Sequence, residues 1–323
     1  MAGRLCVRAT AAACALAAAL AVGACGGDDD GGAPATLDVA LDFTPNAVHA
    51  PLYAAVRDGL DEREGVRLRI RSPGAGPDGL KLVASGRADA GLLDIHDLGL
   101  AVERGSDVVA IGALVQRPLA AVVAVGDVRR PRDLEGRRVG VSGLPSDPAV
   151  LRAVLEHDGA GLARVKQVTI GFNSVQNLVA RKVAAVPVFW NVEGVALRRR
   201  GVRTREFRVD DYGAPRYPEV VVFTSRATLA RKRDQLRGLV RALAAGVDAA
   251  LADRPAAAAE IARAGDADPG LVRAQLDAVA PTFRPALRLD RARLEQWAAF
   301  DVRFGVLKRP PDLDRAFDFG LAP

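Results

Sequence analysis

Three polar side chains open the folded part of the chain at a spacing that suits ligand binding. Asn46, His49 and Tyr53 lie in the stretch LDFTPNAVHAPLYAA, residues 41–55, at positions i, i+3 and i+7. On a helix this spacing places them on one face. The amide and imidazole each offer a donor and an acceptor, and the phenol adds a flat apolar surface. The set suits a small planar polar molecule, although capping by Asn46 and core packing by Tyr53 explain the same residues.

The residues before this helix predict how it is positioned. An alternating run at 36–43 is typical of a strand, and it ends at Thr44, Pro45 and Asn46. Thr44 is the predicted N-cap, and Pro45 suits the first helical position. If the strand ends at a cleft, the helix begins there, and Asn46, His49 and Tyr53 face the gap.

A second candidate group follows another buried strand. In GLLDIHDL, residues 91–98, Asp94 and His96 come directly after the apolar run. A histidine at a strand end is either a hydrogen-bonded structural residue or a contact to a bound molecule. The sequence leaves both interpretations open.

The second half of the chain adds an aromatic and a carboxylate. Asn173 follows a predicted strand and precedes a helix, whose first N–H groups can receive a ligand oxygen. In PVFWNVEGV, residues 187–195, Trp190 and Glu193 follow the next strand together with Asn191. A tryptophan beside a carboxylate offers a stacking wall and an acceptor for an amino group. Tyr217 either lines the cleft floor or packs beneath a loop.

Strand and helix patterns alternate from residue 36 onwards and predict an α/β fold. A second strand–helix series begins after residue 125, and the chain beyond 225 is almost wholly helical. We therefore predict two lobes, residues 37–121 plus 225–323 and residues 122–224, joined by extended crossings near 119–125 and 219–225. Ligands of such sheets bind where the carboxyl ends of the strands meet the cleft.

The first residues predict export and anchoring. Arg4 and Arg8 precede an apolar stretch that is too short to remain in a membrane, and VGAC ends at Cys25. This pattern resembles a lipobox, which predicts a signal peptide at 1–24, lipidation of Cys25, and a flexible tether at 25–36. A conventional signal peptide with an incidental Cys25 is the alternative.

Composition narrows the functional classes. The formal charge is +6, but the arginines are scattered among acidic residues, which is more typical of solvated helix faces than of a nucleic-acid surface. All the cysteines lie in the first 25 residues, so no disulfide or thiolate site is expected beyond them. The chain has no P-loop, and His49, His96 and His157 lack a metal-ligand spacing. We expect neither a metal nor a cofactor.

Three segments resemble a known family. They are LDFTPNAVHAPLYAAVRDG, KLVASGRADAGL and GALVQRPLAAVV. They are similar to thiamine-pyrimidine precursor proteins and to taurine, sulfonate and nitrate receptors of importers, over roughly residues 37–260. The most similar branch holds receptors for formylaminopyrimidine and a yeast pyrimidine synthase. Phe43 stands where that branch usually has tryptophan, and it retains the capacity to stack.

The resemblance implies a two-lobed type II periplasmic binding protein fold with two hinge crossings. It implies a receptor, not an enzyme, that delivers a small planar nitrogenous solute to an ABC permease and ATPase outside the cytoplasm. Glu193 is then the leading specificity residue, and His96 resembles a pocket histidine of the synthase. A sulfonate, nitrate or riboflavin receptor is one alternative. A pyrimidine synthase homologue is another, although its iron-binding cysteine-rich segment has no match here.

Overall fold

The computed structural model describes residues 33–72 and 79–322, in which the strands form two five-stranded sheets. The first sheet has the order β2-β1-β3-β10-β4 and the second β7-β6-β8-β5-β9. The first contains β1 (Ala35–Ala40), β2 (Val66–Arg71), β3 (Ala90–Asp94), β4 (Val108–Val115) and β10 (Val220–Ser225). The second contains β5 (Ala120–Val125), β6 (Arg138–Val141), β7 (Lys166–Thr169), β8 (Ala185–Phe189) and β9 (Thr204–Arg208). The predicted signal peptide, Cys25 and most of the tether lie outside the described residues.

Each sheet is built around parallel strands. In the first sheet β1 pairs in parallel with β2 and β3, and in the second β6 pairs in parallel with β7 and β8. The strands that follow the crossings run the other way: β10 is antiparallel to β3 and β4, and β5 to β8 and β9. The parallel strands of each sheet therefore end at one edge, and their following loops gather there.

The lobe boundaries differ from those predicted. All of β5 belongs to the second sheet and all of β10 to the first, so the crossings are residues 116–119 and 212–219. The sequence placed them too late, at 119–125 and 219–225. Every residue of β4, β5 and β10 is buried. A continuous apolar run indicates a buried strand, but it does not indicate which sheet the strand joins.

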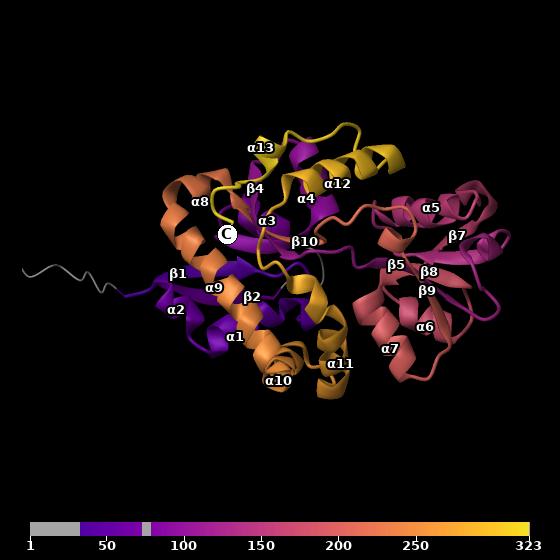
Figure 1. Cartoon of the computed structure of the whole chain (residues 1–323), viewed down its shortest axis with the longest axis horizontal. Coiled ribbons are helices and arrows are strands. Elements are labelled where there is room, and N and C mark those ends of the chain that lie inside the picture. The colour runs from indigo at the N-terminus through magenta and orange to yellow at the C-terminus, as the bar shows by residue number, and fades with distance from the viewer. Residues whose placement is uncertain (1–32, 73–78, 323) are drawn as a thin grey trace, which may run out of the picture. The chain divides into compact units, whose positions relative to one another are not determined.

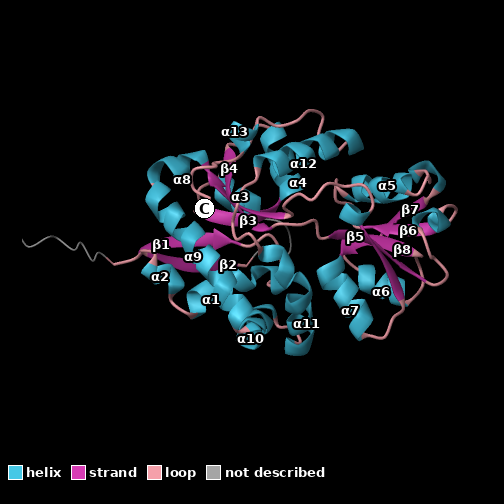
Figure 2. Cartoon of the chain, in the orientation of Figure 1, coloured by secondary structure: helices cyan, strands magenta, loops and turns pink. Residues whose placement is uncertain are grey.

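Helices cover both sheets (Figure 1). In the first lobe these are α1 (Ala50–Arg57), α2 (Leu60–Arg63), α3 (Gly79–Ala84), α4 (Ile95–Glu103), α8 (Arg226–Arg231), α9 (Arg233–Ala252), α10 (Arg254–Gly265), α11 (Pro269–Val279), α12 (Arg291–Phe304) and α13 (Leu313–Ala316). In the second they are α5 (Asp147–His157), α6 (Ser174–Val179) and α7 (Val195–Arg199). Figure 2 shows α5 on one side of the second sheet and α6 and α7 on the other.

The C-terminal helix α9 packs against α1 of the first lobe. A Cβ added at Gly246 of α9 would lie 2.1 Å from the carbonyl oxygen of Pro51 in α1. The two helices therefore approach through a position that only glycine fits. This contact stabilises α1 and, with it, the segment that opens at Asn46.

Candidate functional site

The candidate site is formed by loops at the carboxyl ends of the parallel strands. β1 leads into Phe43, β6 into the loop 142–147, β7 into Phe172, and β8 into a π-helix, η4 (Trp190–Gly194). Helical turns of the π type are rare and often mark functional sites. Ligands of open α/β sheets bind at these ends of the strands.

An aromatic pair joins the two lobes across this region. The side chains of Phe43 and Phe172 are 50% and 67% exposed, and their ring centroids lie 5.9 Å apart at an interplanar angle of 50°. Phe43 was a predicted site residue, whereas Phe172 was not singled out. Exposed large apolar side chains normally carry a cost in water, so an exposed pair at facing strand ends indicates a surface that a flat apolar group can cover.

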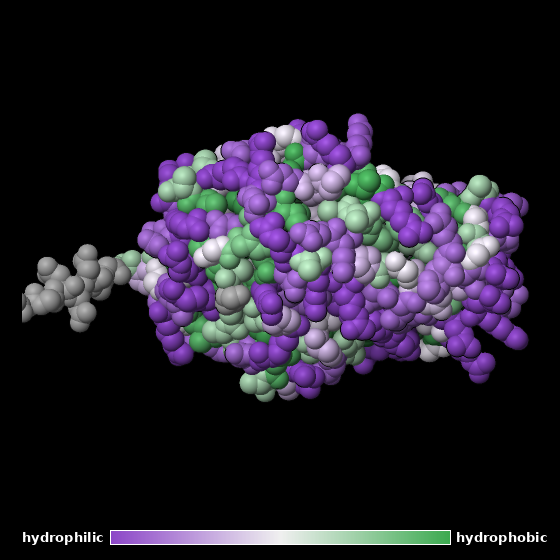
Figure 3. Space-filling view, turned by 45° about the horizontal axis from the view of Figure 1, so that its top comes forward, coloured by the Kyte–Doolittle hydropathy of each residue, from purple (hydrophilic) through white to green (hydrophobic). Residues whose placement is uncertain are grey.

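The positions of all the large exposed apolar residues agree with this location. Among the described residues they are Phe43, Val56, Leu144, Phe172 and Val179. Three of the five, Phe43, Leu144 and Phe172, lie in loops that follow β1, β6 and β7. The face drawn in Figure 3 is mostly hydrophilic, with apolar patches between the hydrophilic residues.

The opening motif is largely a structural cap. Asn46, not Thr44, is the N-cap: its Oδ1 accepts from the Val48 N–H at 3.0 Å, and its Nδ2 donates to the Thr44 carbonyl at 3.0 Å. His49 Nδ1 accepts from the Asn46 N–H at 3.1 Å, which completes a capping box.

The prediction that His49 faces the cleft is wrong. The residue has no exposed surface, and its Nε2 lies 2.7 Å from Asp42 Oδ1. Burial by itself would raise the pKa of Asp42, but the hydrogen bond from His49 and those from the backbone of Asp42 and Phe43 outweigh it and lower that pKa. Both ring nitrogens are therefore used inside the protein, because the strand end at Asp42 folds back over the helix start.

Tyr53 is half-buried and packs against the core of the first lobe. Burial raises the pKa of its phenol, whose hydroxyl is hydrogen-bonded to Ser72 just after β2. Asn46 lies before a 3-10 turn, Ala47–His49, and Tyr53 lies within α1. The three side chains thus do not share one helix face as the spacing predicted.

His96 is the centre of a buried hydrogen-bonded group. Its Nδ1 lies 2.7 Å from Asp301 Oδ1 in α12, and its Nε2 lies 3.1 Å from the Tyr217 hydroxyl. Burial would lower the pKa of His96, but the carboxylates of Asp301, Asp94 and Glu219 raise it to about 10. The imidazolium donates from both nitrogens, so it has no group left for a ligand.

Two neighbours of His96 are also structural. Asp94 caps α4 by accepting from the His96 N–H at 2.7 Å, and burial raises its pKa well above the usual range. Tyr217 is fully buried, and burial raises its pKa well above the ordinary value. Of the two interpretations left open for Tyr217, packing inside the protein is the one that the structure supports.

Glu219 connects the two crossings and was not found from the sequence. Its carboxylate accepts from the Leu119 N–H at 2.8 Å, and its own N–H donates to the Val115 carbonyl at 2.9 Å. Burial raises the pKa of this carboxyl to about 7. A glutamate in an apolar run was the only available signal, since EVVVFTS begins with it.

Trp190 is not the stacking wall that was predicted. It is buried; its Nε1 donates to the Pro118 carbonyl at 3.1 Å, and the Arg208 guanidinium lies 4.1 Å from the ring centroid. The tryptophan thus holds the first crossing against the second lobe. Its aromatic face is already occupied by a cation.

Glu193 remains the best candidate for a polar ligand contact. It is half-buried, and its Oε2 accepts from the Phe189 N–H at 3.2 Å. Burial raises the pKa of Glu193, and the described residues place no cation against its carboxylate. A partly exposed carboxylate without a cation beside it can accept a further hydrogen bond from an amino group on a ligand.

Asn191 and Asn173 offer further polar groups. Asn191 has no exposed surface, and neither Nδ2 nor Oδ1 has a hydrogen-bond partner in the described structure. Asn173 is exposed at the start of α6, and its side chain does not cap that helix. Asn191 was noticed in the sequence but not selected, because nothing in the local pattern distinguishes a satisfied amide from an unpaired one.

The arrangement is suited to binding. In the described part of the chain there is no group of histidine, cysteine and acidic residues that could hold a metal. No helix in those residues combines the length and apolarity needed to cross a bilayer. Exposed aromatic faces on both lobes, with a carboxylate acceptor after another strand of the second sheet, can hold a flat ring that bears hydrogen-bond donors.

Comparison with known proteins agrees with this fold. Residues 46–258 match the family model described as NMT1/THI5 like. The chain is 32% identical over 216 residues to the formylaminopyrimidine-binding protein of Halalkalibacterium halodurans, with 66% of each chain covered. It is 24% identical over 231 residues to the 4-amino-5-hydroxymethyl-2-methylpyrimidine phosphate synthase of Uromyces fabae, with 67% of each covered. The matched part thus spans about two thirds of these relatives.

Among solved structures, the periplasmic aliphatic sulphonate binding protein of Escherichia coli superimposes with a TM-score of 0.72 at 16% identity, covering 87% of this chain and 91% of that one. At this identity the similarity establishes the fold alone. It confirms the predicted two-lobed binding-protein architecture. The family model covers most of the chain, and we conclude that the chain belongs to the NMT1/THI5-like family.

Proposed function

We propose that this protein is the extracytoplasmic solute receptor of an ABC importer and that it captures a small planar nitrogenous ring, such as a thiamine pyrimidine precursor. The observation that carries the proposal is the exposed pair of Phe43 and Phe172, one from each lobe, at facing strand ends. The exposed faces of this pair offer a flat apolar surface on which a heteroaromatic ring can stack. The name of the Halalkalibacterium relative supports the same ligand class.

The polar residues define the edges of the proposed ligand. Glu193 would accept from an exocyclic amino group, and the unpaired amide of Asn191 would supply a donor and an acceptor once a shift of the π-helix exposes it. Asn173 would contribute from the start of α6. Closure over a ligand is the usual motion of two lobes joined by a hinge.

The receptor would act with a permease and an ATPase, and lipidation of Cys25 would keep it at the membrane. These partners and this anchor follow from the predicted signal sequence and the class of the relatives. Residues 1–32, which would carry the anchor, lie outside the described part of the chain.

A synthase is less well supported than a receptor. His49 and His96 are the histidines near the proposed site, and each has both ring nitrogens hydrogen-bonded within the protein. A general base must reach the proton that it removes. Turnover of a pyridoxal-type compound by the purified protein would overturn the receptor proposal.

Calorimetric titration with formylaminopyrimidine tests the assignment. Wild-type protein should bind it, and Glu193→Gln should weaken binding by about tenfold, or about 1.4 kcal/mol, because one acceptor becomes a donor. Glu295→Gln, at an exposed position of α12, is the matched control and should leave the affinity unchanged. An unchanged affinity in Glu193→Gln would remove the main support for an aminopyrimidine ligand.

A further inference from the structure

The loop after β6 holds a carboxylate among its own backbone N–H groups. Asp147, the first residue of α5, is 7% exposed. Its Oδ2 accepts from the Ser142 N–H at 2.6 Å, the Ser142 Oγ at 2.7 Å and the Gly143 N–H at 3.0 Å. Gly143 has a φ of 98°, a conformation that favours glycine. Converging N–H groups of this kind form a site for an anion, and here the anion is part of the chain.

This loop lies between the two segments of the second lobe that belong to the proposed site. The strand order β7-β6-β8 places it between the loop of Phe172 and the π-helix of Glu193. Val141 pairs with Thr169 at the end of β6 and β7, so the two loops start side by side. A ligand that stacks on Phe172 and contacts Glu193 would therefore pass over residues 142–147.

An anionic group on such a ligand would meet two obstacles. The N–H groups of Ser142 and Gly143 already donate to Asp147, and Leu144 donates to the Ser142 Oγ at 3.3 Å. A phosphate or sulfonate oxygen would have to displace a buried carboxylate that accepts charge-assisted hydrogen bonds. It would also approach the carboxylates of Asp147 and Glu193, and like charges brought together at an interface oppose binding.

We propose that Asp147 serves as an internal anion that excludes phosphate and sulfonate groups and restricts this receptor to uncharged or cationic amino-heterocycles. The inference rests on the proposed function, because it concerns the ligand class of the same site. Asp147 thereby acts as a specificity residue through the loop that it holds, whether or not it contacts the ligand.

A matched pair of ligands tests the inference without any mutation. The two are 4-amino-5-hydroxymethyl-2-methylpyrimidine and its phosphate ester, which differ only in the anionic group. Calorimetric titration of wild-type protein should show the ester binding at least about 100-fold more weakly than the alcohol, which is about 2.8 kcal/mol. Equal or tighter binding of the ester would overturn the inference and leave the proposed function standing. Binding of neither compound, nor of formylaminopyrimidine, would instead contradict the proposed function.

Two variants test whether Asp147 is the residue that excludes the phosphate ester. Asp147→Asn removes the charge at constant size, and Asp147→Ser also frees the N–H groups. In each variant, the dissociation constant of the ester divided by that of the alcohol should fall by about tenfold or more, which is about 1.4 kcal/mol. If the serine variant does not fold, the asparagine variant decides. A ratio unchanged in a folded variant would show that another group excludes the ester.

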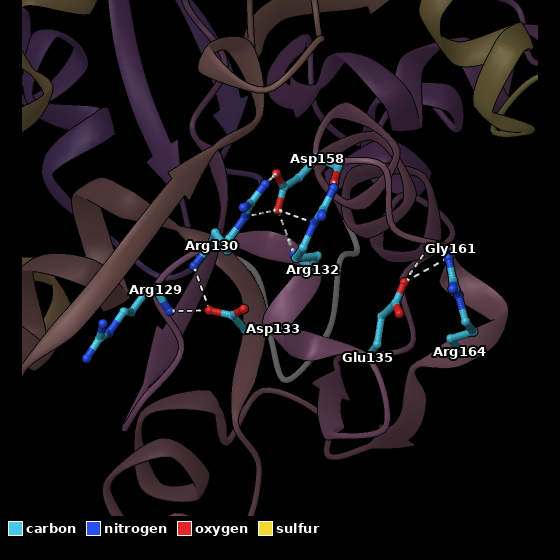
Figure 4. A network of polar contacts seen from close by, with 8 residues as sticks. All are labelled: Arg129, Arg130, Arg132, Asp133, Glu135, Asp158, Gly161 and Arg164. Atoms are coloured by element: carbon cyan, nitrogen blue, oxygen red, sulfur yellow. Dashed lines mark hydrogen bonds and ion pairs between the residues drawn. The ribbon is translucent and has the colours of Figure 1, made fainter.

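Asp133→Asn is the matched control. Asp133 also accepts from two backbone N–H groups, those of Arg129 at 2.8 Å and Arg130 at 3.1 Å (Figure 4). It precedes β6, at the opposite end of that strand from Asp147. The control variant should lose a similar local cap and keep the wild-type ratio. A loss of discrimination in both variants would mean that general loosening of the lobe, not Asp147, changes selectivity.

Discussion

At the scale of the residue, Asn191 combines full burial with an unpaired amide. Neither of its polar side-chain atoms has a hydrogen-bond partner in the described structure. A buried polar group without a partner costs about 1–3 kcal/mol of stability. Proteins retain such groups where they serve a function, and the π-helix that carries Asn191 also carries Glu193 of the proposed site.

Asn191→Leu should therefore separate stability from binding. Leucine is similar in size and has no polar atom to satisfy, so the free energy of unfolding without ligand should rise by about 1 kcal/mol. The affinity for formylaminopyrimidine should fall in the same variant. Urea unfolding and calorimetric titration measure the two quantities. A variant that is less stable yet binds normally would contradict the role given to this amide.

At the scale of the element, surface arginines join secondary structures to one another. Arg130 lies just before the 3-10 turn Pro131–Leu134, and Arg132 lies within it. Both contact Asp158 at the end of α5 (Figure 4). These bonds lower the pKa of Asp158 to about 2, mainly through the Arg130 side chain. At this position, two of the many arginines thus attach a loop to a helix.

The two crossings form another element-scale unit, with Glu219 between them. The folded state holds the proton of Glu219 up to about pH 7, whereas the unfolded chain releases it near 4.5. The free energy of unfolding should therefore fall as pH rises from 4.5 through 7. His96 acts in the same direction. Its contribution to the free energy of unfolding is full below about pH 6.5 and is lost as pH rises through about 10.

Glu219→Gln should remove the fall in the free energy of unfolding between pH 4.5 and 7. The glutamine oxygen can still accept from the Leu119 N–H, so the variant should fold. Its stability relative to wild type should increase between pH 4.5 and 7, since only the wild type must release a buried proton there. Thermal unfolding at a series of pH values measures this difference, with Glu295→Gln as control. Parallel pH curves for Glu219→Gln and wild type would refute the assignment.

At the scale of the whole molecule, the C-terminal helices of the first lobe contact the second lobe. Gln275 of α11 donates to the Val192 carbonyl in the π-helix at 3.4 Å. Arg152 of α5 donates to the Arg303 carbonyl in α12 at 3.2 Å. Together with Phe43 and Phe172, these contacts connect the lobes away from the two crossings.

Ligand binding should therefore close the molecule. Small-angle X-ray scattering of the purified protein should show a smaller radius of gyration at saturating formylaminopyrimidine than without it, because the ring would be enclosed by both lobes. Glu193→Gln at the same ligand concentration should show a smaller decrease, in proportion to its lower occupancy. An unchanged radius at full occupancy would argue for a preformed pocket within one lobe.

The alternation of strands and helices was predictable from local patterns. The strands at 66–71 and 108–115 and the helices at 269–279 and 291–304 follow periodicity that the chain displays within a few residues. The strand β9 was missed, since TREFR is polar at an edge of its sheet. The exposure of Phe43 also agreed with its predicted place at a strand end.

The sequence alone determined the two strand–helix series, the family motif, and the candidate loops after the strands. Only the tertiary structure decided which side chains in those loops are free. His96 is occupied by Asp301, which lies 205 positions away, and Trp190 by Pro118 and Arg208. Hydropathy and spacing are local properties of a chain, whereas burial and hydrogen-bond pairing depend on residues that folding brings from far away. For that reason Phe172 and Asp147, and the unpaired state of the Asn191 amide, emerged only from the folded molecule.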